Sequence, residues 1–426
     1  MGRRKEQLYA AVDVGTTKIA TLVAKVATTG AMEIVAVGHA SSAGMRKGLV
    51  VSPEELGESV RRSVDEATAM LGRQMPPAYV GVTGAHLVCL NAAASISRES
   101  GKGRQRAFSQ EEVDRLLMST YPERTGRRLV HVVPRSYQVD GKGGIKDPVG
   151  LNGTSLMAES HVVLGDRAQM ENLARVVRGA GVKVRGMVLE HLASAEAVLT
   201  NDERQAGAVL VDIGGGTSDI AIYKDGAAWY TAALPVAGQH FTSDLAVALG
   251  LPPSVAETTK LEHGSAHVGD GDRGQAITVE TGLGDHTREI SLQSVNQLLH
   301  DRAVELVRLI LHKVTESGLE RVPLGGMVLT GGSASLPGLA EIAADYGECP
   351  VRIGRPSPAL GLPDELEQTS FSTAVGLVLW AVRHRHVGAV VPDVDVSPTV
   401  MGRLRGWLSK LSPTRPGEGR PSEVRT

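Results

Sequence analysis

Two stretches of this chain, starting 200 residues apart, are variants of one short hairpin. The first reads YAAVDVGTTKIATLVA (9–24) and the second VLVDIGGGTSDIAIYK (209–224). Each is an apolar strand ending in an aspartate, then a turn of Gly and Thr, then a second strand. The second copy has two more residues before its Ile-Ala, which we expect in the turn. Glycine lets backbone N–H groups approach phosphate oxygens closely. The repeat therefore predicts two similar halves with a nucleotide between them.

The aspartates of the two hairpins, Asp13 and Asp212, are candidate metal ligands. Magnesium keeps most of its waters and is often held by one or two carboxylates plus phosphate oxygens. The hydroxyl groups that could donate to phosphate are those of Thr16, Thr17 and Thr217, and Lys18 could neutralise phosphate charge. The alternative is that these are two ordinary hairpins with polar turns. The occurrence of both, together with a third motif, favours the nucleotide site.

That third motif is MVLTGGSASLPGL (327–339), in which a buried strand runs into Gly-Gly-Ser and then a helix. Such a turn lets a flat ring or a ribose lie against bare backbone. A Gly-Gly turn alone is weak evidence for a nucleotide site. It supports such a site here because the same chain also contains the two hairpins.

Composition bounds the class of protein. The 426 residues are 42% hydrophobic and 22% charged, which is typical of a globular protein with several domains. Aromatic residues make up 3%, so we expect an aliphatic core. A net charge of −2 argues against nucleic-acid binding. The two cysteines, Cys89 and Cys349, form no motif and are expected to be structural thiols in a reducing cytosol. No run of about 18 apolar residues predicts a spanning helix, so we expect a cytoplasmic protein unless it attaches peripherally to a membrane.

The tail carries a short basic amphipathic segment, VMGRLRGWLSKL (400–411). On a helix its apolar side chains share one face and its basic side chains lie toward the other, a pattern typical of helices that lie in a membrane interface. The alternatives are a helix packed back on the body or a disordered tail. The residues that we expect to contact an anionic membrane surface are Met401, Arg403, Leu404, Arg405, Trp407, Leu408, Lys410 and Leu411.

The order of motifs resembles the actin/Hsp70/sugar-kinase ATPase superfamily: Asp-x-Gly-Thr-Thr, then Asp-x-Gly-Gly-Gly-Thr-x-Asp, then Thr-Gly-Gly-Ser. The finer resemblance is to the FtsA family of bacterial cell-division proteins. It rests on AVDVGTTKIATLV, EHLASAEA (190–197), VLVDIGGGTSDIAIY, VLTGGSASLPGL and FSTAVGLVLWA (371–381), and on the tail. The resemblance covers roughly residues 8–386. It implies an α/β, actin-like ATPase fold: two duplicated halves around a nucleotide cleft, with an inserted small α+β subdomain.

The resemblance also implies ATP and Mg2+ in the cleft, with the hydrated metal on Asp13 and Asp212. Glu190 matches the acidic residue near the attacking water, although relatives usually have Pro where this chain has His191. Glu257 and Lys260 match positions that contact the nucleoside, and their alternative is a local surface ion pair. The expected phosphate contacts are Gly15, Thr16, Thr17, Lys18, Gly214, Gly215, Gly216 and Thr217, and the adenosine side is expected at Gly331, Gly332 and Ser333.

By resemblance we expect seven parts. These are subdomain 1A (1–83, 166–206 and 371–387), insert 1C (84–165), subdomain 2A (207–242 and 321–370), subdomain 2B (243–320), a linker (388–398), the membrane helix (399–411) and a disordered tail (412–426). The implied role is an ATP-regulated polymer, at most a weak ATPase. It would tether FtsZ filaments to the cytoplasmic side of the membrane at the septum, through the FtsZ C-terminal peptide, and recruit divisome proteins. The alternatives are the actin-like ATPase of type IV pilus assembly and a small-molecule kinase of the same superfamily.

Overall fold

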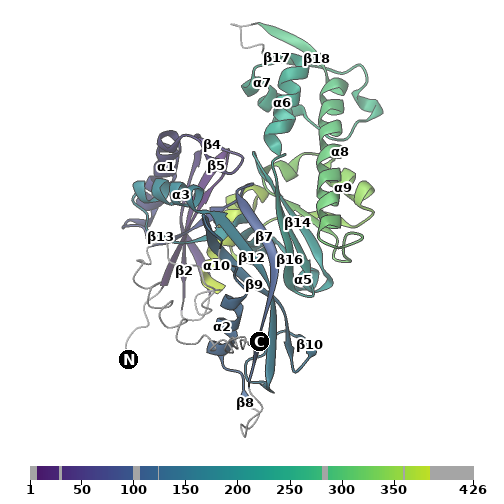
Figure 1. Cartoon of the computed structure of the whole chain (residues 1–426). Helices are drawn as coiled ribbons and strands as arrows, with labels where there is room; N and C mark the ends of the chain where they lie inside the picture. The colour runs from purple at the N-terminus through teal and green to yellow at the C-terminus, as the bar shows by residue number, and fades with distance from the viewer. Residues whose placement is uncertain are drawn as a thin grey trace, which may run out of the picture.

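The protein is built from two halves, each around a five-stranded sheet, as Figure 1 shows. The computed structural model describes residues 7–27, 31–98, 106–122, 124–280, 286–357 and 360–383. The predicted linker, membrane helix and tail (388–426) lie outside the described residues. Among the described residues, no helix is both long and apolar enough to cross a bilayer.

The two sheets have the same plan. The first has the order β13–β6–β1–β2–β3 and the second β20–β19–β14–β15–β16. In each, the first three strands are parallel and the last two join antiparallel. The strands of the first sheet are β1 (Gln7–Val14), β2 (Lys18–Val26), β3 (Met32–Ser41), β6 (Ala78–Val82) and β13 (Val184–Leu189). Those of the second are β14 (Ala208–Ile213), β15 (Ser218–Lys224), β16 (Ala227–Leu234), β19 (Met327–Thr330) and β20 (Val351–Ile353). The duplication expected from the hairpins is therefore confirmed over the whole of both sheets.

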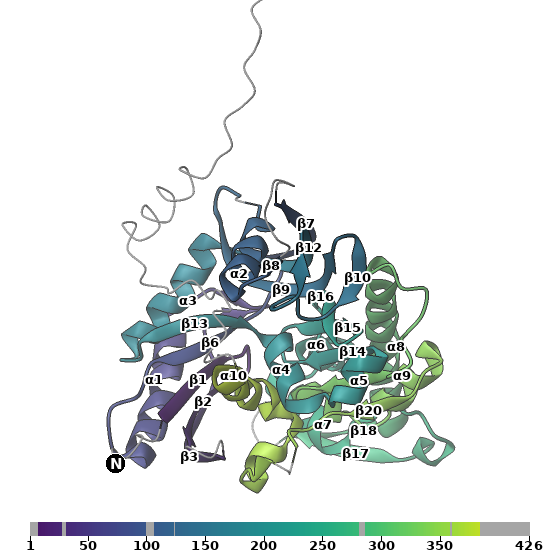
Figure 2. The same cartoon turned by 90° about the horizontal axis from the view of Figure 1, so that it is seen from below.

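Helices cover the sheets, and two of them lie between the halves. Those of the first half are α1 (Pro53–Leu71), α3 (Arg167–Gly179), α4 (Glu190–Val198) and α10 (Ser372–Arg383). Those of the second half are α6 (Gly238–Leu249), α7 (Pro253–His263), α8 (Leu292–Glu316) and α9 (Leu339–Gly347). Helix α5 (Asn201–Ala206), at the end of the segment expected in subdomain 1A, contacts β15 of the second sheet. The packed pair α4 and α10 runs between the two sheets (Figure 2), and α4 contacts strands of both.

Local sequence explains where such helices begin and end. Pro53 occupies the first turn of α1, where its fixed φ suits the helix, and Gly72 ends it with φ +67°. The buried residues Leu56, Val60 and Val64 recur at four-residue spacing and pack into the core of the first half. That core is dominated by Val, Leu, Ile and Ala, as the scarcity of aromatic residues predicts.

The insert, two small hairpins and several 3-10 turns complete the fold. In its described residues the insert has a four-stranded sheet of order β10–β9–β12–β7, one helix and a small strand pair. Its elements are β7 (Leu87–Ser97), β8 (Arg106–Ala107), α2 (Gln110–Ser119), β9 (Arg127–Val139), β10 (Lys142–Ile145), β11 (Asn152–Gly153) and β12 (Ser155–Asp166). Its sheet lies against edge strand β16 of the second half (Figure 1). The further hairpins are β4–β5 (Met45–Arg46, Leu49–Val50) and β17–β18 (Ala276–Glu280, Thr287–Ser291), and the 3-10 turns are η1 (Asp270–Asp272), η2 (Gly332–Ser335), η4 (Asp364–Glu367) and η5 (Thr369–Phe371).

Candidate functional site

One cleft between the halves, of about 990 Å3, is lined by every residue predicted to bind nucleotide or metal. Its size lies at the upper end of what small-molecule sites use. These residues come from five separate parts of the chain: the two hairpins, the start of α4, helix α7, and the loop after β19. The sequence linked the third motif to the hairpins only because all three occur in one chain. In the structure they lie together around one cleft.

The two turns have the same length, and the expectation of a longer second turn is wrong. In the first, Gly15 N–H donates to Lys18 O at 2.9 Å, and in the second Gly214 N–H donates to Thr217 O at 2.9 Å. The flanking pairs are Val14 with Ile19 and Ile213 with Ser218. The two extra residues, Ser218 and Asp219, therefore lie in strand β15, where both are buried.

The turns also face and touch each other. A Cβ atom on Gly216 would lie 2.5 Å from Thr16 Oγ1, and a Cβ atom on Gly215 would collide with the Thr17 side chain. These contacts place the threonine side chains of the first turn on the bare backbone of the second. Only glycine leaves room for this approach, which explains why the second turn is so rich in it.

Acidic side chains gather at the base of the cleft. Burial raises the pKa of Asp13 to about 7, with Lys18 lowering it and Asp212 raising it further. Burial likewise raises the pKa of Glu190 well above its ordinary value, and the charges of Asp13, Asp219 and Asp212 add to the effect. Carboxylates held this close repel each other, so a cation among them would stabilise their charged forms.

These residues fit a hydrated magnesium ion better than a fully ligated metal. Within the described ranges, no three His, Cys, Asp or Glu side chains are grouped closely enough to hold a metal directly. Magnesium does not need such a group, because it keeps several waters and takes phosphate oxygens as ligands. Two buried carboxylates facing one polar cleft are therefore a sufficient donor set.

Two hydroxyl groups that the sequence did not single out fix Asp212. Ser194 on α4 donates to Asp212 Oδ2, and Thr373 on α10 donates to the same oxygen at 2.9 Å. Burial raises the pKa of Asp212, and these two hydrogen bonds oppose that rise. No local pattern in the sequence marks either hydroxyl as a partner of Asp212.

Lys18 lines the cleft, but its ammonium group is engaged at the start of α10. It donates to the carbonyl of Ser370, and Nζ lies 3.4 Å from the centroid of the Phe371 ring. Burial lowers the pKa of Lys18 to about 8, although the carboxylates of Asp13, Asp212 and Glu365 raise it. A phosphate contact from Lys18 stays a prediction, and it requires the ammonium group to leave Ser370.

The third motif closes against the second hairpin. Gly331 has φ +86°, and a Cβ atom there would collide with Asp212 Oδ1. Ser333 Oγ donates to Gly214 O at 2.9 Å. The Gly-Gly-Ser turn is thus part of the cleft wall beside Asp212, and its contact with an adenosine stays a prediction.

Glu257 and Lys260 form an ion pair that also faces the cleft. Lys260 Nζ lies 2.7 Å from Glu257 Oε2 and donates to Thr242 Oγ1 at 3.0 Å. The ion pair of the alternative interpretation is present, and both residues line the cleft, whereas their contact with a nucleoside stays a prediction.

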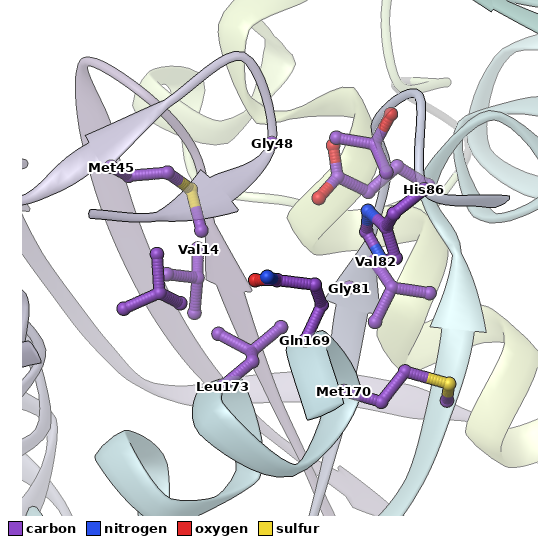
Figure 3. Close-up of a pocket in the computed structure, with 12 residues that line it drawn as sticks. Val14, Met45, Gly48, Gly81, Val82, His86, Gln169, Met170 and Leu173 are labelled. Carbon is purple, nitrogen blue, oxygen red and sulfur yellow. The ribbon is translucent and has the colours of Figure 1, made fainter. Parts of the chain in front are cut away.

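A side cavity of about 10 Å3 adjoins the cleft and shares four lining residues with it: Val14, Met45, Thr83 and Glu190. Figure 3 shows Gln169 reaching into it from the start of α3, beneath the β4–β5 hairpin, with His86 on the opposite side. The cavity has room for about one water. It is a small, mostly apolar space that Glu190 also lines.

Solved structures with this architecture define the class of protein. The PilM–PilN type IV pilus biogenesis complex has a TM-score of 0.61 at 15% identity, covering 88% of this chain and 98% of that one. MreB5 of Spiroplasma citri bound to ADP has a TM-score of 0.52 at 14% identity, covering 90% and 99%. At such identities the likeness concerns the fold alone: this is an actin-like ATPase fold with an insert.

Sequence comparison then gives the family. The model of the cell division protein FtsA matches residues 209–376, and that of the SHS2 domain inserted in FtsA matches 84–164. The chain is 35% identical to the cell division protein FtsA of Pseudomonas aeruginosa, over 94% of this chain and 97% of the relative. It is 34% identical to that of Escherichia coli (strain K12), over 95% and 97%. The chain belongs to the FtsA family of cell-division proteins, as its motifs indicated.

Proposed function

We propose that this chain binds ATP with Mg2+ in the cleft between its two halves, and that the bound nucleotide regulates polymerisation. The observation that carries the proposal is that two equivalent Asp-Gly-rich turns touch across one cleft with a buried carboxylate beside each. A triphosphate would supply both the negative charge that the turn N–H groups attract and the oxygens that complete the coordination of magnesium. The ADP bound to MreB5 supports a nucleotide in this fold.

The proposed roles follow the positions of the side chains. Asp13 and Asp212 hold the hydrated metal, and the two turns hold the phosphates. The wall at Gly331, Gly332 and Ser333 and the pair Glu257–Lys260 receive the nucleoside. Glu190 orients the attacking water. Because burial and the neighbouring carboxylates raise its pKa, it can accept a proton only after a bound cation has lowered that pKa. Turnover is therefore slow and regulatory.

Calorimetry with the full chain tests this proposal. Mg-ATP should bind wild type and the Asp65→Asn variant, whose changed carboxylate is exposed on α1. Asp212→Asn should bind far more weakly. Equal binding by Asp212→Asn and Asp65→Asn would contradict the assignment, and no binding by wild type would end it.

We further propose that the nucleotide-bound protein polymerises on the cytoplasmic face of the membrane at the division septum. There it would tether FtsZ filaments and recruit other divisome proteins. Membership of the cell-division family supports this role. Three cations near an anionic surface contribute about 3 kcal/mol, so the predicted helix at 399–411 binds weakly alone and firmly when many copies are linked. We keep 243–320 as the proposed receptor of the FtsZ C-terminal peptide, within the seven-part division given above.

Liposome flotation and electron microscopy test the tether. Deletion of 399–411 should abolish flotation on anionic vesicles, whereas Trp407→Ala should weaken it. Rows of subunits should form on a lipid monolayer only with ATP. An unchanged lipid-bound fraction after the deletion would exclude this role for the tail.

The two alternatives have less support. The likeness to the PilM–PilN complex is one of fold, at 15% identity. A small-molecule kinase has no use for a basic amphipathic tail, and turnover of ATP with sugars and small acids would reveal it. Relatives named as cell-division proteins cover almost the full chain, which favours the tether.

A further inference from the structure

A short polar segment, residues 369–373, forms η5 and the start of helix α10 beside the cleft. Its sequence is Thr-Ser-Phe-Ser-Thr. Four of its five residues are buried, and only Ser370 is partly exposed. Ser370 and Thr373 line the cleft. Thr373 holds Asp212, whereas the hydroxyl group of Ser370 has no role in the proposed nucleotide site.

Hydrogen bonds on both sides of Ser370 fix this segment to the second half. Thr369 Oγ1 lies 3.0 Å from Ser335 Oγ, at the end of η2. Ser372 Oγ lies 2.7 Å from Thr330 Oγ1, at the end of β19. Both partners belong to the strand and the turn that carry the Gly-Gly-Ser motif. Ser370 is therefore held at a fixed place beside that motif.

Ser370 is bonded through its backbone, which leaves its side chain free for a ligand. Its carbonyl accepts a hydrogen bond from Lys18 of the first hairpin. A Cβ atom on Gly332 would lie 3.8 Å from the Cβ atom of Ser370, so the serine side chain lies beside the bare backbone of that glycine. Within the part of the chain that the structure describes, the Ser370 hydroxyl group has no hydrogen-bond partner.

We propose that the Ser370 hydroxyl group is a further nucleoside-binding group, which hydrogen-bonds the ribose or the base of a nucleotide lying against Gly332. This role of Ser370 rests on the proposed binding of ATP. A serine hydroxyl can donate one hydrogen bond and accept two, so it suits a ribose hydroxyl, a ring nitrogen or an amino group. Binding sites orient their ligands with a few polar groups that are held on rigid elements. Ser370 is such a group, because the residues around it and its own carbonyl are already bonded.

Stability distinguishes Ser370 from its neighbour Ser372. Removing the Ser370 hydroxyl breaks no hydrogen bond among the described residues, so Ser370→Ala should unfold at the wild-type temperature without nucleotide. Removing the Ser372 hydroxyl breaks a buried bond to Thr330, so Ser372→Ala should unfold at a lower temperature. A purely structural role for Ser370 would instead lower the unfolding temperature of both variants.

Titration calorimetry of the full chain with nucleotide analogues tests the contact. Ser370→Ala should bind Mg-ATP and Mg-ADP about fivefold more weakly than wild type, by the same factor, because both ligands contain the nucleoside. The 2′-deoxy and 3′-deoxy analogues of ATP each lack one ribose hydroxyl. The 1-deaza, 3-deaza and 7-deaza analogues each lack one ring nitrogen, and purine riboside triphosphate lacks the amino group. Wild type should bind the analogue that lacks the partner of Ser370 about fivefold more weakly than ATP, and Ser370→Ala should bind that analogue as it binds ATP.

The outcomes separate this role from the proposed function. Coupling to a deoxy analogue identifies the ribose as the partner, and coupling to one of the other analogues identifies the base. Ser372→Ala and Ser119→Ala, whose hydroxyl groups bond within the protein, should show no such coupling. If Ser370→Ala binds Mg-ATP as tightly as wild type, or loses affinity without coupling to any analogue, the role of Ser370 is overturned and the proposed function stands. If wild type binds no Mg-ATP, both fail.

Discussion

The two hairpins share a backbone and differ in what they place on it. In the first, Asp13 faces Ala20 across the strand pair, and in the second Asp212 faces Asp219. The first turn carries side-chain donors, Thr16, Thr17 and Lys18, whereas the second carries three glycines that offer backbone N–H groups. The two turns thus share one backbone geometry but offer different hydrogen-bond donors. One side of the cleft presents mainly side chains, and the other presents mainly glycine backbone.

The supports of the two aspartates differ as well. Asp212 Oδ2 receives hydroxyl groups from Ser194 on α4 and Thr373 on α10, the helices that run between the halves. Asp13 relies on the nearby charge of Lys18. A carboxylate held by two hydroxyl groups is pre-organised for a ligand, whereas one surrounded by apolar strands resists ionisation. We therefore expect Asp212 to position the metal and Asp13 to respond to its presence.

The largest expected effect is the loss of Mg-ATP binding when the charge of each aspartate is removed in turn. Asp212→Asn should weaken Mg-ATP binding by about 100-fold or more, ~2.7 kcal/mol, because the pre-organised ligand is lost. Asp13→Asn should weaken it about tenfold, since Asn still offers an oxygen where ionisation was already costly. Titration calorimetry of both variants measures the difference. A stronger loss in Asp13→Asn than in Asp212→Asn would reverse the assignment of roles.

The second prediction concerns pH and stability without metal or nucleotide. Burial raises the folded-state pKa of Asp13 from 3.8 to about 7. Wild type therefore loses stability as the pH rises between these two values, and it loses no more at higher pH. Asp13→Asn removes this penalty. In EDTA, its free energy of unfolding should exceed that of wild type by about 4 kcal/mol at pH 8, and the difference should shrink toward pH 5.

Urea denaturation at both pH values measures the effect. Asp65→Asn on the surface of α1 serves as the control and should show no such trend. An Asp13→Asn variant that is less stable than wild type at pH 8 would mean that its carboxylate is satisfied in the metal-free protein.

A third prediction uses the contact between the turns. Gly215→Ala brings a methyl group against Thr17 and should cost about 1–2 kcal/mol of stability through overpacking, with weaker nucleotide binding. The double variant Gly215→Ala, Thr17→Gly should recover most of the loss, because it removes the colliding atoms. Gly179→Ala, where a Cβ atom meets nothing within 4 Å, is the matched control. Additive losses in the double variant would show that the turns do not touch.

Much of the site follows from the sequence because glycine patterns and strand-end aspartates report local geometry. The hairpins and the Gly-Gly-Ser turn were found this way, whereas the Glu257–Lys260 pair came from the family resemblance. The place of Asp219 was missed because aligning the hairpins on Ile-Ala put two strand residues in the turn. The contact of Lys18 with Ser370 joins positions 352 residues apart, which no local pattern reports. Ser194 and Thr373 were missed for a similar reason, since they lie 18 and 161 residues from Asp212 in the chain.

The smallest expected effect on Mg-ATP binding comes from removing the two hydroxyl groups that hold Asp212. Ser194→Ala and Thr373→Val each remove one donor from Asp212 Oδ2, so each should weaken Mg-ATP binding about fivefold, ~1 kcal/mol, while the other hydroxyl still holds the carboxylate. Their combination should exceed the sum of the single effects, because both donors serve one oxygen. Thr373→Ser should bind as wild type does. Ser119→Ala, whose hydroxyl bonds within α2 of the insert, should change nothing. If the double variant binds Mg-ATP as tightly as wild type, Asp212 needs no support from α4 and α10, and the difference between the two aspartates lies in burial alone.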